Sequence, residues 1–379
     1  PLAHGTKQLP PRGPNLSRPV VCIAPTATPP KVDGVLGDAC WSTAVAVRPF
    51  HLSYQGGWPP YRAEAVLTYD VNNLYVGLRT FAPDRVRYPK LPWPPDRDAS
   101  VAELLIDTGL AEAFYKVAVT STAQVHVTQP MANAVPWRQP VTAAMRRCAG
   151  GWVAEFAIPF AAVDLPAPRP TCTWRVNLGW RTPKCVGYSA WAVTHAWFYE
   201  PQYYGDLHFG GAHALTATLT GVDAPKPGRN ELAVTLTNRA ATATPCEVLV
   251  TLRDTVGSRV VFQRVVAVPG GGTTVVEADY RLPDGMDGTA TVTVRRGAAP
   301  EAFFRQSLRI RVPANRNTYR AVRATLTALP SASPAPPWVA TERDAITTHL
   351  GRIAARLEAA DISPADWQAL ARPLRQLLG

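Results

Sequence analysis

The sequence lacks the long hydrophobic run of a transmembrane helix: none of its 379 residues lie in a stretch of 18 or more apolar residues. No apolar segment near the first residue is typical of a signal peptide. GxGxxG, P-loop, GxSxG and HExxH motifs are also absent, so no motif supports a nucleotide-binding, serine-hydrolase or zinc-protease function.

Lysine is scarce, although the net charge is +11: only six of the 39 basic residues are lysine. The arginines are scattered singly, and the longest runs are the pairs Arg146-Arg147 and Arg295-Arg296. A surface that binds nucleic acid usually gathers Lys and Arg on one face. The charge therefore does not predict a nucleic-acid partner.

Metal-binding cysteine patterns are missing as well. The six cysteines form neither a CxxC motif nor a His/Cys metal spacing. Cys172 and Cys185 are not expected to pair with each other, because the strand-like segment between them would hold them about 25 Å apart. Disulfides between more distant positions and free buried thiols both remain open.

Short segments with period-two alternation of apolar and polar residues dominate residues 19–211 and follow a Pro- and Gly-rich lead-in at 1–18. Asn72-Asn73 and Gly150-Gly151 are typical of hairpin turns. No helical pattern alternates with these strands, so we predict an all-β fold, an antiparallel β-sandwich. The clearest strands are AEAVLTYD (63–70), LYVGLRT (74–80), VAELLID (101–107), FYKVAVT (114–120), GWVAEFAIP (151–159), WRVNLGW (174–180) and YSAWAVT (188–194).

A second all-β module is expected at 212–314, with about one strand per 12–15 residues. This spacing predicts an immunoglobulin-like or fibronectin-like sandwich, although no Cys…Trp…Cys pattern occurs. Its simplest role is that of a spacer or accessory domain. The expected strands are ELAVTLTNR, CEVLVTLRD, RVVFQRVVAV, TTVVEADYRL, GTATVTVRRG and FRQSLRIRV.

The pattern changes to a helical one in residues 315–379, which we predict to be a linker and a helical hairpin. After SASPAPPW (331–338), the segment THLGRIAARLEAA carries Leu350, Ile353 and Leu357 on one stripe. A second helix is predicted to begin after Ser363, with proline at its first position and Asp366 in its first turn.

Six segments in order resemble the family 9 carbohydrate-binding modules and the wider DOMON-like group, whose fold is a jelly-roll-like β-sandwich. These segments span about 190 residues. They are VDGVLGDACW (32–41), LTYDVNNLYVGLRT (67–80), RDASVAELLID (97–107), GGWVAEFAIPF (150–160), WRVNLG (174–179) and EPQYYGDLHF (200–209). The resemblance implies a non-catalytic domain that binds an oligo- or polysaccharide.

The resemblance also implies a sugar site, in which two aromatic rings clamp a sugar and polar side chains bind its hydroxyls. The implied carbohydrate-binding residues are Trp93, Glu103, Lys116, and Trp197 or Phe198. Tyr199, a spare loop aromatic outside the family pattern, is a further candidate for a ligand platform. Strand geometry puts alternate residues on one face. One face of the first strand carries Val101, Glu103, Leu105 and Asp107, and one face of the next carries Phe114, Lys116 and Ala118. If the two strands pair, Glu103 and Lys116 come within reach; the alternative role for them is a cross-strand salt bridge on a solvated face.

Other residues are expected to be structural. Trp41, Trp152 and Trp174 are predicted to anchor the core. Asp33 and Asp38 bracket two glycines in a tight turn and are predicted to form that turn, although the resemblance allows a structural calcium there. No other cofactor is expected, and no catalytic constellation is evident.

Two other functions remain open. A DOMON-like relative could bind b-type haem, with axial ligands from Met131 or Met145 and from His126, His195 or a lysine. Alternatively, the chain is a structural or interaction module that has no ligand site and positions a catalytic domain. Under the leading hypothesis the protein is extracellular or periplasmic, has no membrane span, and works beside an attached or partner glycoside-active domain.

Overall fold

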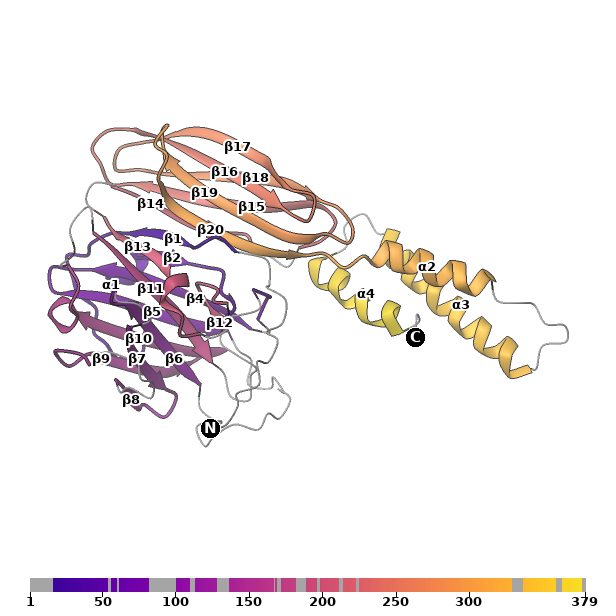
Figure 1. The fold of residues 1–379 in the computed structure, drawn as a ribbon, viewed down its shortest axis with the longest axis horizontal. Coiled ribbons are helices and arrows are strands. Elements are labelled where there is room, and N and C mark those ends of the chain that lie inside the picture. The colour runs from indigo at the N-terminus through magenta and orange to yellow at the C-terminus, as the bar shows by residue number, and fades with distance from the viewer. Residues whose placement is uncertain are drawn as a thin grey trace, which may run out of the picture.

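Two β-sandwiches and a group of helices make up the chain (Figure 1). The computed structural model describes residues 16–53, 56–59, 61–81, 100–109, 113–127, 136–166, 168, 172–181, 189–195, 198–210, 214–222, 225–328, 337–358 and 363–376. In Figure 1 the first sandwich, indigo to magenta, lies against the second, which is orange, and the helices extend from one end of the second sandwich.

One sheet of the first sandwich has the strand order β2-β4-β5-β10-β9. Its neighbouring strands are antiparallel, as the hairpin turns predict. At the turn between β4 and β5, the Asp70 carboxylate accepts hydrogen bonds from the backbone N–H groups of Asn72 and Asn73. The strands are β2 (Val45–Val47), β4 (Arg62–Tyr69), β5 (Asn73–Phe81), β10 (Gly151–Pro159) and β9 (Thr142–Cys148).

The facing sheet has the strand order β1-β13-β11-β6-β7-β8 within the first sandwich, and two short strands, β12 and β3, extend it beside β11. The predicted strands at 101–107 and 114–120 are confirmed at both ends, whereas the one predicted at 188–194 is regular only at Ser189–Ala190. The strands are β1 (Val20–Ile23), β13 (Gly205–Phe209), β11 (Thr173–Arg181), β6 (Val101–Asp107), β7 (Phe114–Thr120), β8 (Val125–His126), β12 (Ser189–Ala190) and β3 (His51–Leu52).

The core of this sandwich consists of the alternate side chains that the two sheets turn toward each other. Trp174 lies in it, as predicted, and so do Trp180 and Trp191. Trp41 is buried in a smaller cluster behind the first sheet. Trp152 is only half-buried and packs against the main core, because it lies at the start of β10.

The second sandwich packs the sheet β14-β15-β18 against the strands β17-β16-β19-β20 around a core of its own. All six strands predicted in this region are observed, within three residues at their ends. The immunoglobulin-like assignment stays a prediction. The strands are β14 (Leu215–Thr220), β15 (Gly228–Asn238), β16 (Thr244–Arg253), β17 (Ser258–Val268), β18 (Thr273–Leu282), β19 (Asp287–Arg296) and β20 (Ala302–Arg311).

Strand β1 joins the two sandwiches into one continuous sheet. It pairs with β13 in parallel, the exception to the antiparallel pattern, and with β20 in the antiparallel sense at Val20 and Arg305. Val21 and Ile23 face the first core, while Cys22 lies between them and enters the second core. The second sandwich is therefore not a loosely tethered spacer.

Side chains also cross the junction. The indole N–H of Trp191 donates to Gln306 Oε1 at 3.0 Å, and the ring Nε2 of His51 lies 3.0 Å from the Ser307 carbonyl oxygen. Both contacts are buried. The two sandwiches share polar contacts that only a fixed arrangement satisfies.

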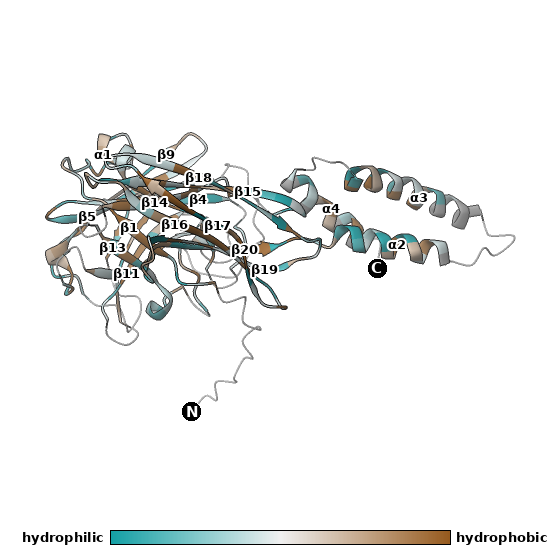
Figure 2. Cartoon of the chain, turned by 90° about the horizontal axis from the view of Figure 1, so that it is seen from above, coloured by the Kyte–Doolittle hydropathy of each residue, from teal (hydrophilic) through white to brown (hydrophobic). Residues whose placement is uncertain are grey.

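The C-terminal region differs from the predicted hairpin, because a helix also forms in the predicted linker. Besides the short α1 (Ala39–Thr43), the helices are α2 (Asn315–Ala328), α3 (Pro337–Glu358) and α4 (Pro364–Gln376). Ser363 caps α4 as predicted, since its Oγ accepts the Asp366 N–H at 3.0 Å. Polar residues cover much of α2 (Figure 2), although its apolar residues keep to one face of the helix. None of the helices in the described ranges is long and apolar enough to span a bilayer.

Candidate functional site

Strand β6 is buried on both faces, which the alternating pattern of a half-solvated strand does not predict. Ala102, Leu104 and Ile106 pack into the first core. The opposite face lies beneath the segment 198–204, which includes the 3₁₀ helix η3 (Pro201–Tyr203). That outer face and its cover form a separate small cluster of Leu105, Phe114, Ala190, Phe198 and Tyr204, with Tyr199 packed against it.

Glu103, Lys116 and Tyr199 meet on this outer face and form a triangle of polar contacts. Lys116 Nζ lies 3.1 Å from Glu103 Oε1 and donates to the Tyr199 hydroxyl at 2.9 Å. The Tyr199 hydroxyl lies 3.1 Å from Glu103 Oε2. Strands β6 and β7 do pair, as expected, in a register that sets Glu103 opposite Ala118 and Lys116 opposite Leu105. The two charges are therefore diagonal neighbours on one face.

The surroundings of this triangle are far from solvated. The side chains of Glu103 and Lys116 are only 3% and 11% exposed. The alternative prediction was a salt bridge on a solvated face. The salt bridge forms, but the face is buried, because the 198–204 segment covers the strand. A buried ion pair needs good geometry and further hydrogen bonds to offset its desolvation, and the Tyr199 hydroxyl supplies one.

Aromatic contacts hold Tyr199 over the triangle. Its ring stacks on Phe114 with centroids 5.7 Å apart and planes 4° apart, and Lys116 Nζ lies 4.6 Å from the Tyr199 ring centroid. The stack and the cation–π contact fix the ring from the strand side. Tyr199 is nonetheless only partly buried, so it offers surface to a ligand.

Further charged and polar groups lie along the same face. Asp107 Oδ2 pairs with Arg175 Nη1 at 3.0 Å, and its other oxygen accepts the Gly109 N–H at 2.9 Å. The Tyr204 hydroxyl is buried and meets no hydrogen-bond partner among the described residues. Burial, and then the nearby charges of Glu103 and Asp107, hold the pKa of Tyr204 well above its usual value. Tyr204 therefore remains a neutral phenol in this face.

The residues that the resemblance implies are only partly brought together by the described structure. Glu103, Lys116 and Tyr199 meet. Phe198 is 3% exposed, and its ring packs so tightly on Gly179 that an added Cβ there would lie 2.1 Å from Phe198 Cζ. Of the two alternatives for the second clamp position, Phe198 is thus a packing residue. Trp93 and Trp197 lie outside the described residues.

Sequence reasoning placed Phe114 on the same strand face as Lys116 but gave it no role in the site, and it missed Tyr204. A signal for Phe114 was present, because it shares the alternation of Lys116 along β7. Tyr204 has no such signal, since it reaches the face from outside regular structure after η3.

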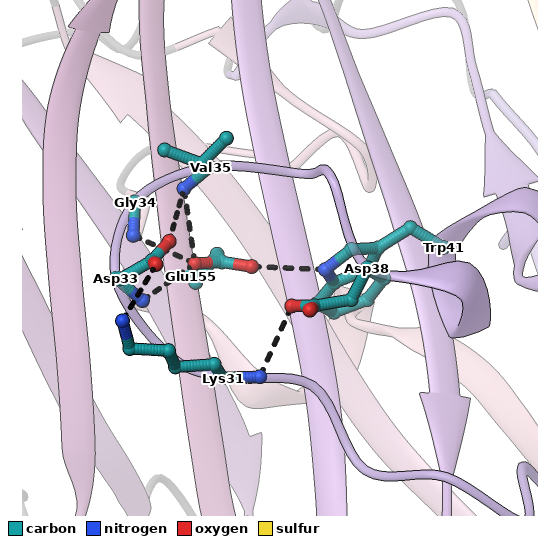
Figure 3. Close-up of polar contacts among 7 residues, drawn as sticks. All are labelled: Lys31, Asp33, Gly34, Val35, Asp38, Trp41 and Glu155. Carbon is teal, nitrogen blue, oxygen red and sulfur yellow. Dashed lines mark hydrogen bonds and ion pairs between the residues drawn. The ribbon is translucent and has the colours of Figure 1, made fainter.

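A second group of acidic residues lies at the other sheet (Figure 3). Glu155 is on β10, and Asp33 and Asp38 are in the loop beside it. Glu155 Oε2 accepts three backbone N–H groups, from Asp33, Gly34 and Val35, at 2.8, 2.6 and 3.2 Å. Its Oε1 accepts the indole N–H of Trp41 at 2.9 Å. Burial raises the pKa of Glu155, while these hydrogen bonds oppose the rise. Glu155 thus fastens the 33–35 turn and Trp41 to β10.

Asp33 and Asp38 act in the turn, as predicted. Asp33 Oδ1 accepts the Val35 N–H at 3.1 Å, and Asp38 Oδ2 accepts the Lys31 N–H at 3.0 Å. Within the described ranges, no group of three or more His, Cys, Asp and Glu residues is arranged to hold a metal ion. The carboxylates of Asp33, Asp38 and Glu155 accept N–H groups of the turn and of Trp41. A structural calcium stays a prediction.

The candidate haem ligands lie on separate elements. Met145 of β9 is buried in the first core, His126 is exposed on β8, and the ring of His195 stacks on Tyr203. Met131 lies outside the described residues. Among the described cysteines, Cys40, Cys148 and Cys246 are free thiols.

Comparisons with known proteins return solved structures only. No family model matches this chain, and no curated protein sequence matches it. Among solved structures, the chain is similar to a family 9 carbohydrate-binding module from Caldicellulosiruptor kristjanssonii in complex with cellotriose, with 15% identity and a TM-score of 0.38. That match covers 50% of this chain and 94% of the module.

Two other solved structures match to a similar extent. The module from Caldicellulosiruptor kristjanssonii in complex with glucose is 14% identical, with a TM-score of 0.38, and the match covers 50% of this chain and 96% of the module. A putative carbohydrate-binding protein from Bacteroides uniformis is 13% identical, with a TM-score of 0.36, and the match covers 50% of this chain and 97% of that protein.

Proposed function

We propose that this chain is a carbohydrate-binding module whose site is the outer face of β6 and β7, at the triangle of Glu103, Lys116 and Tyr199. The triangle is the observation that carries the proposal. It sets a cation, a phenol and a carboxylate together beside a stacked aromatic pair. The resemblance implies two of the three triangle residues, Glu103 and Lys116.

The two implied clamp tryptophans are close in sequence to described residues of this face. Trp197 is separated from Tyr199 by a single residue, and Trp93 belongs to the segment that leads into β6. An aromatic ring suits the C–H face of a pyranose. In the proposal, Trp93 and Trp197 stack on the sugar.

The polar residues have distinct roles in this proposal. An ammonium group carries three N–H donors, of which Lys116 directs two toward Glu103 and Tyr199. The third donor is offered to a sugar hydroxyl. Glu103, which is nearly inaccessible, orients Lys116 and Tyr199.

Binding fits this face better than glycoside hydrolysis. Glu103 and Asp107 are four residues apart on one extended strand, which separates them by about 13 Å at about 3.3 Å per residue. The two carboxyl groups of glycosidases are about 5–9.5 Å apart. Each acid here also has a basic partner, Lys116 or Arg175. The resemblance extends the proposal to an exported protein that works with a glycoside-active domain.

The test is calorimetric titration of the intact chain with glucan, xylan and their oligosaccharides. Trp93→Ala and Trp197→Ala are expected to weaken binding about tenfold or more, since losing one large apolar contact surface costs about 1.5–3 kcal/mol. The matched control is Tyr203→Ala, which removes a 40% exposed aromatic ring near the same face. Absence of binding across the panel, or an equal loss in the control, contradicts the proposal.

A further inference from the structure

A cavity of about 210 Å³ lies where the first sandwich meets the end of β14 in the second. It is away from the triangle on β6 and β7, and none of the three triangle residues lines it. Its walls are Arg48, Pro49, Phe50, Trp58, Pro59, Tyr61, Arg62 and Ala63 of the first sandwich and Thr220, Gly221 and Val222 of the second.

Aromatic side chains form one part of the wall. The indole N–H of Trp58 donates to the Arg309 carbonyl oxygen at 3.0 Å, and the Tyr61 hydroxyl donates to the Trp180 carbonyl oxygen at 3.1 Å. The polar ends of both residues are therefore directed at the backbone. Trp58 is partly exposed and offers carbon surface to an occupant, which suits the C–H face of a ring, while Phe50 and Tyr61, which are 2% and 3% exposed, close the wall from the core side.

Two arginines supply positive charge to the same cavity. Arg48 Nη1 lies 3.0 Å from Glu64 Oε2, and Arg62 Nη2 lies 3.8 Å from the same oxygen. Two guanidinium groups thus share one carboxylate oxygen, which leaves a net positive charge. The Arg62 side chain is 64% exposed, and a guanidinium group presents five N–H donors in a planar fork that matches a carboxylate.

Size narrows the class of occupant. Pockets for drug-sized ligands measure about 300–1,000 Å³, so a cavity of about 210 Å³ suits a single ring. The aromatic wall favours a ring with an apolar face, and the arginines favour a carboxylate on that ring. A hexuronic acid has both properties.

We propose that this cavity, which we call the seam pocket, is a second binding site and takes one uronic acid residue. Its sugar ring packs on the aromatic wall and its carboxylate pairs with Arg62 beside Arg48. Because the walls come from both sandwiches, an occupied seam pocket also stabilises their junction.

The test compares methyl β-glucuronide with methyl β-glucoside, which differ at the carboxylate, by calorimetry and melting temperature. The measurements are made on the Trp93→Ala protein, so that the site proposed on β6 and β7 is impaired and the two proposals succeed or fail separately. The glucuronide is expected to bind and to raise the melting temperature. The glucoside is expected to bind at least about tenfold more weakly, because it lacks a charge-assisted hydrogen bond.

Arg62→Gln provides the decisive variant, and Arg79→Gln its matched control. Both arginines are exposed and lie over the ring of Phe81, at 5.5 and 4.9 Å from its centroid, but Arg79 does not line the seam pocket. Arg62→Gln is expected to weaken glucuronide binding about tenfold, while Arg79→Gln leaves it within about twofold.

Four results overturn the proposal. They are an absence of glucuronide binding, equal affinity for the two glycosides, an equal loss in both arginine variants, and tighter binding of benzoate than of the glucuronide. The last result would assign the seam pocket to aromatic acids instead of sugars.

Discussion

The ion pair between Glu103 and Lys116 combines two charges that are almost fully removed from solvent, with 3% and 11% of their side chains exposed. At a separation of 3.1 Å and an effective dielectric constant of about 20, their attraction is on the order of 5 kcal/mol before desolvation is counted. Removing one partner of such a pair typically costs about 3–5 kcal/mol, because the other charge stays buried.

We therefore predict that Lys116→Met lowers the free energy of unfolding by about 3 kcal/mol, and that Glu103→Gln also destabilises the protein. The double variant is expected to recover most of this loss, since it leaves no unpaired charge, which gives a coupling energy of about 2 kcal/mol or more. Urea unfolding monitored by tryptophan fluorescence measures all three variants.

A surface pair provides the control for this cycle. Arg138 Nη2 and Asp164 Oδ2 lie 2.6 Å apart, but their side chains are 60% and 69% exposed. Arg138→Met is expected to cost at most about 1 kcal/mol. If Lys116→Met costs no more than Arg138→Met, the two charges on β6 and β7 are not held in a dry environment, and the reasoning is refuted.

Three further perturbations test other parts of the structure. Glu155→Gln is expected to lower the unfolding free energy by about 2–3 kcal/mol. The amide oxygen can replace one carboxylate oxygen, but the amide NH2 group cannot accept a hydrogen bond, so either the turn N–H groups or the Trp41 indole loses its acceptor. An unchanged melting temperature contradicts this. Burial lowers the pKa of His51 to about 4, below its unfolded value of about 6.5, so the folded state favours the neutral ring. The contribution of neutral His51 to the free energy of unfolding is complete above about pH 6.5. It decreases toward pH 4 by up to about 1.4 kcal/mol per pH unit, and His51→Leu should flatten this slope in urea unfolding. Gly34→Ala is expected to destabilise the protein more than Gly109→Ala by about 1 kcal/mol or more, since both have a positive φ but only at Gly34 would a Cβ meet a neighbour, at 2.7 Å; equal melting temperatures refute this.

Local alternation was enough to predict most strands. VAELLID and FYKVAVT are short, largely apolar segments that turn residues bound, and both strands are confirmed at both ends. The second sandwich was predictable for the same reason. These signals are local, and they require no knowledge of which strands pair.

Contacts between distant segments could not be predicted in the same way. Strand β6 is buried on its outer face because Phe198 and Tyr204 pack there from about 95 residues away. Strand β1 serves both cores, and nothing in the four residues Val20–Ile23 indicates a shared strand. Helix α2 was missed because its polar residues outnumber the few that it buries, such as Val322.

The candidate site was predictable in part. The resemblance gave Glu103 and Lys116, Tyr199 was named as a further loop aromatic, and strand geometry gave the proximity of the two charges. The third contact, from the Tyr199 hydroxyl, depends on how the 198–204 segment folds back over β6 and β7, which alternation does not reveal.

The most direct test of the proposed function is a crystal structure of the intact chain with a bound xylo- or gluco-oligosaccharide. The account predicts a sugar ring between Trp93 and Trp197, with one of its hydroxyl groups about 3 Å from Lys116 Nζ, a normal hydrogen-bond distance. A sugar bound elsewhere on the chain, with the outer face of β6 and β7 unoccupied, would contradict it.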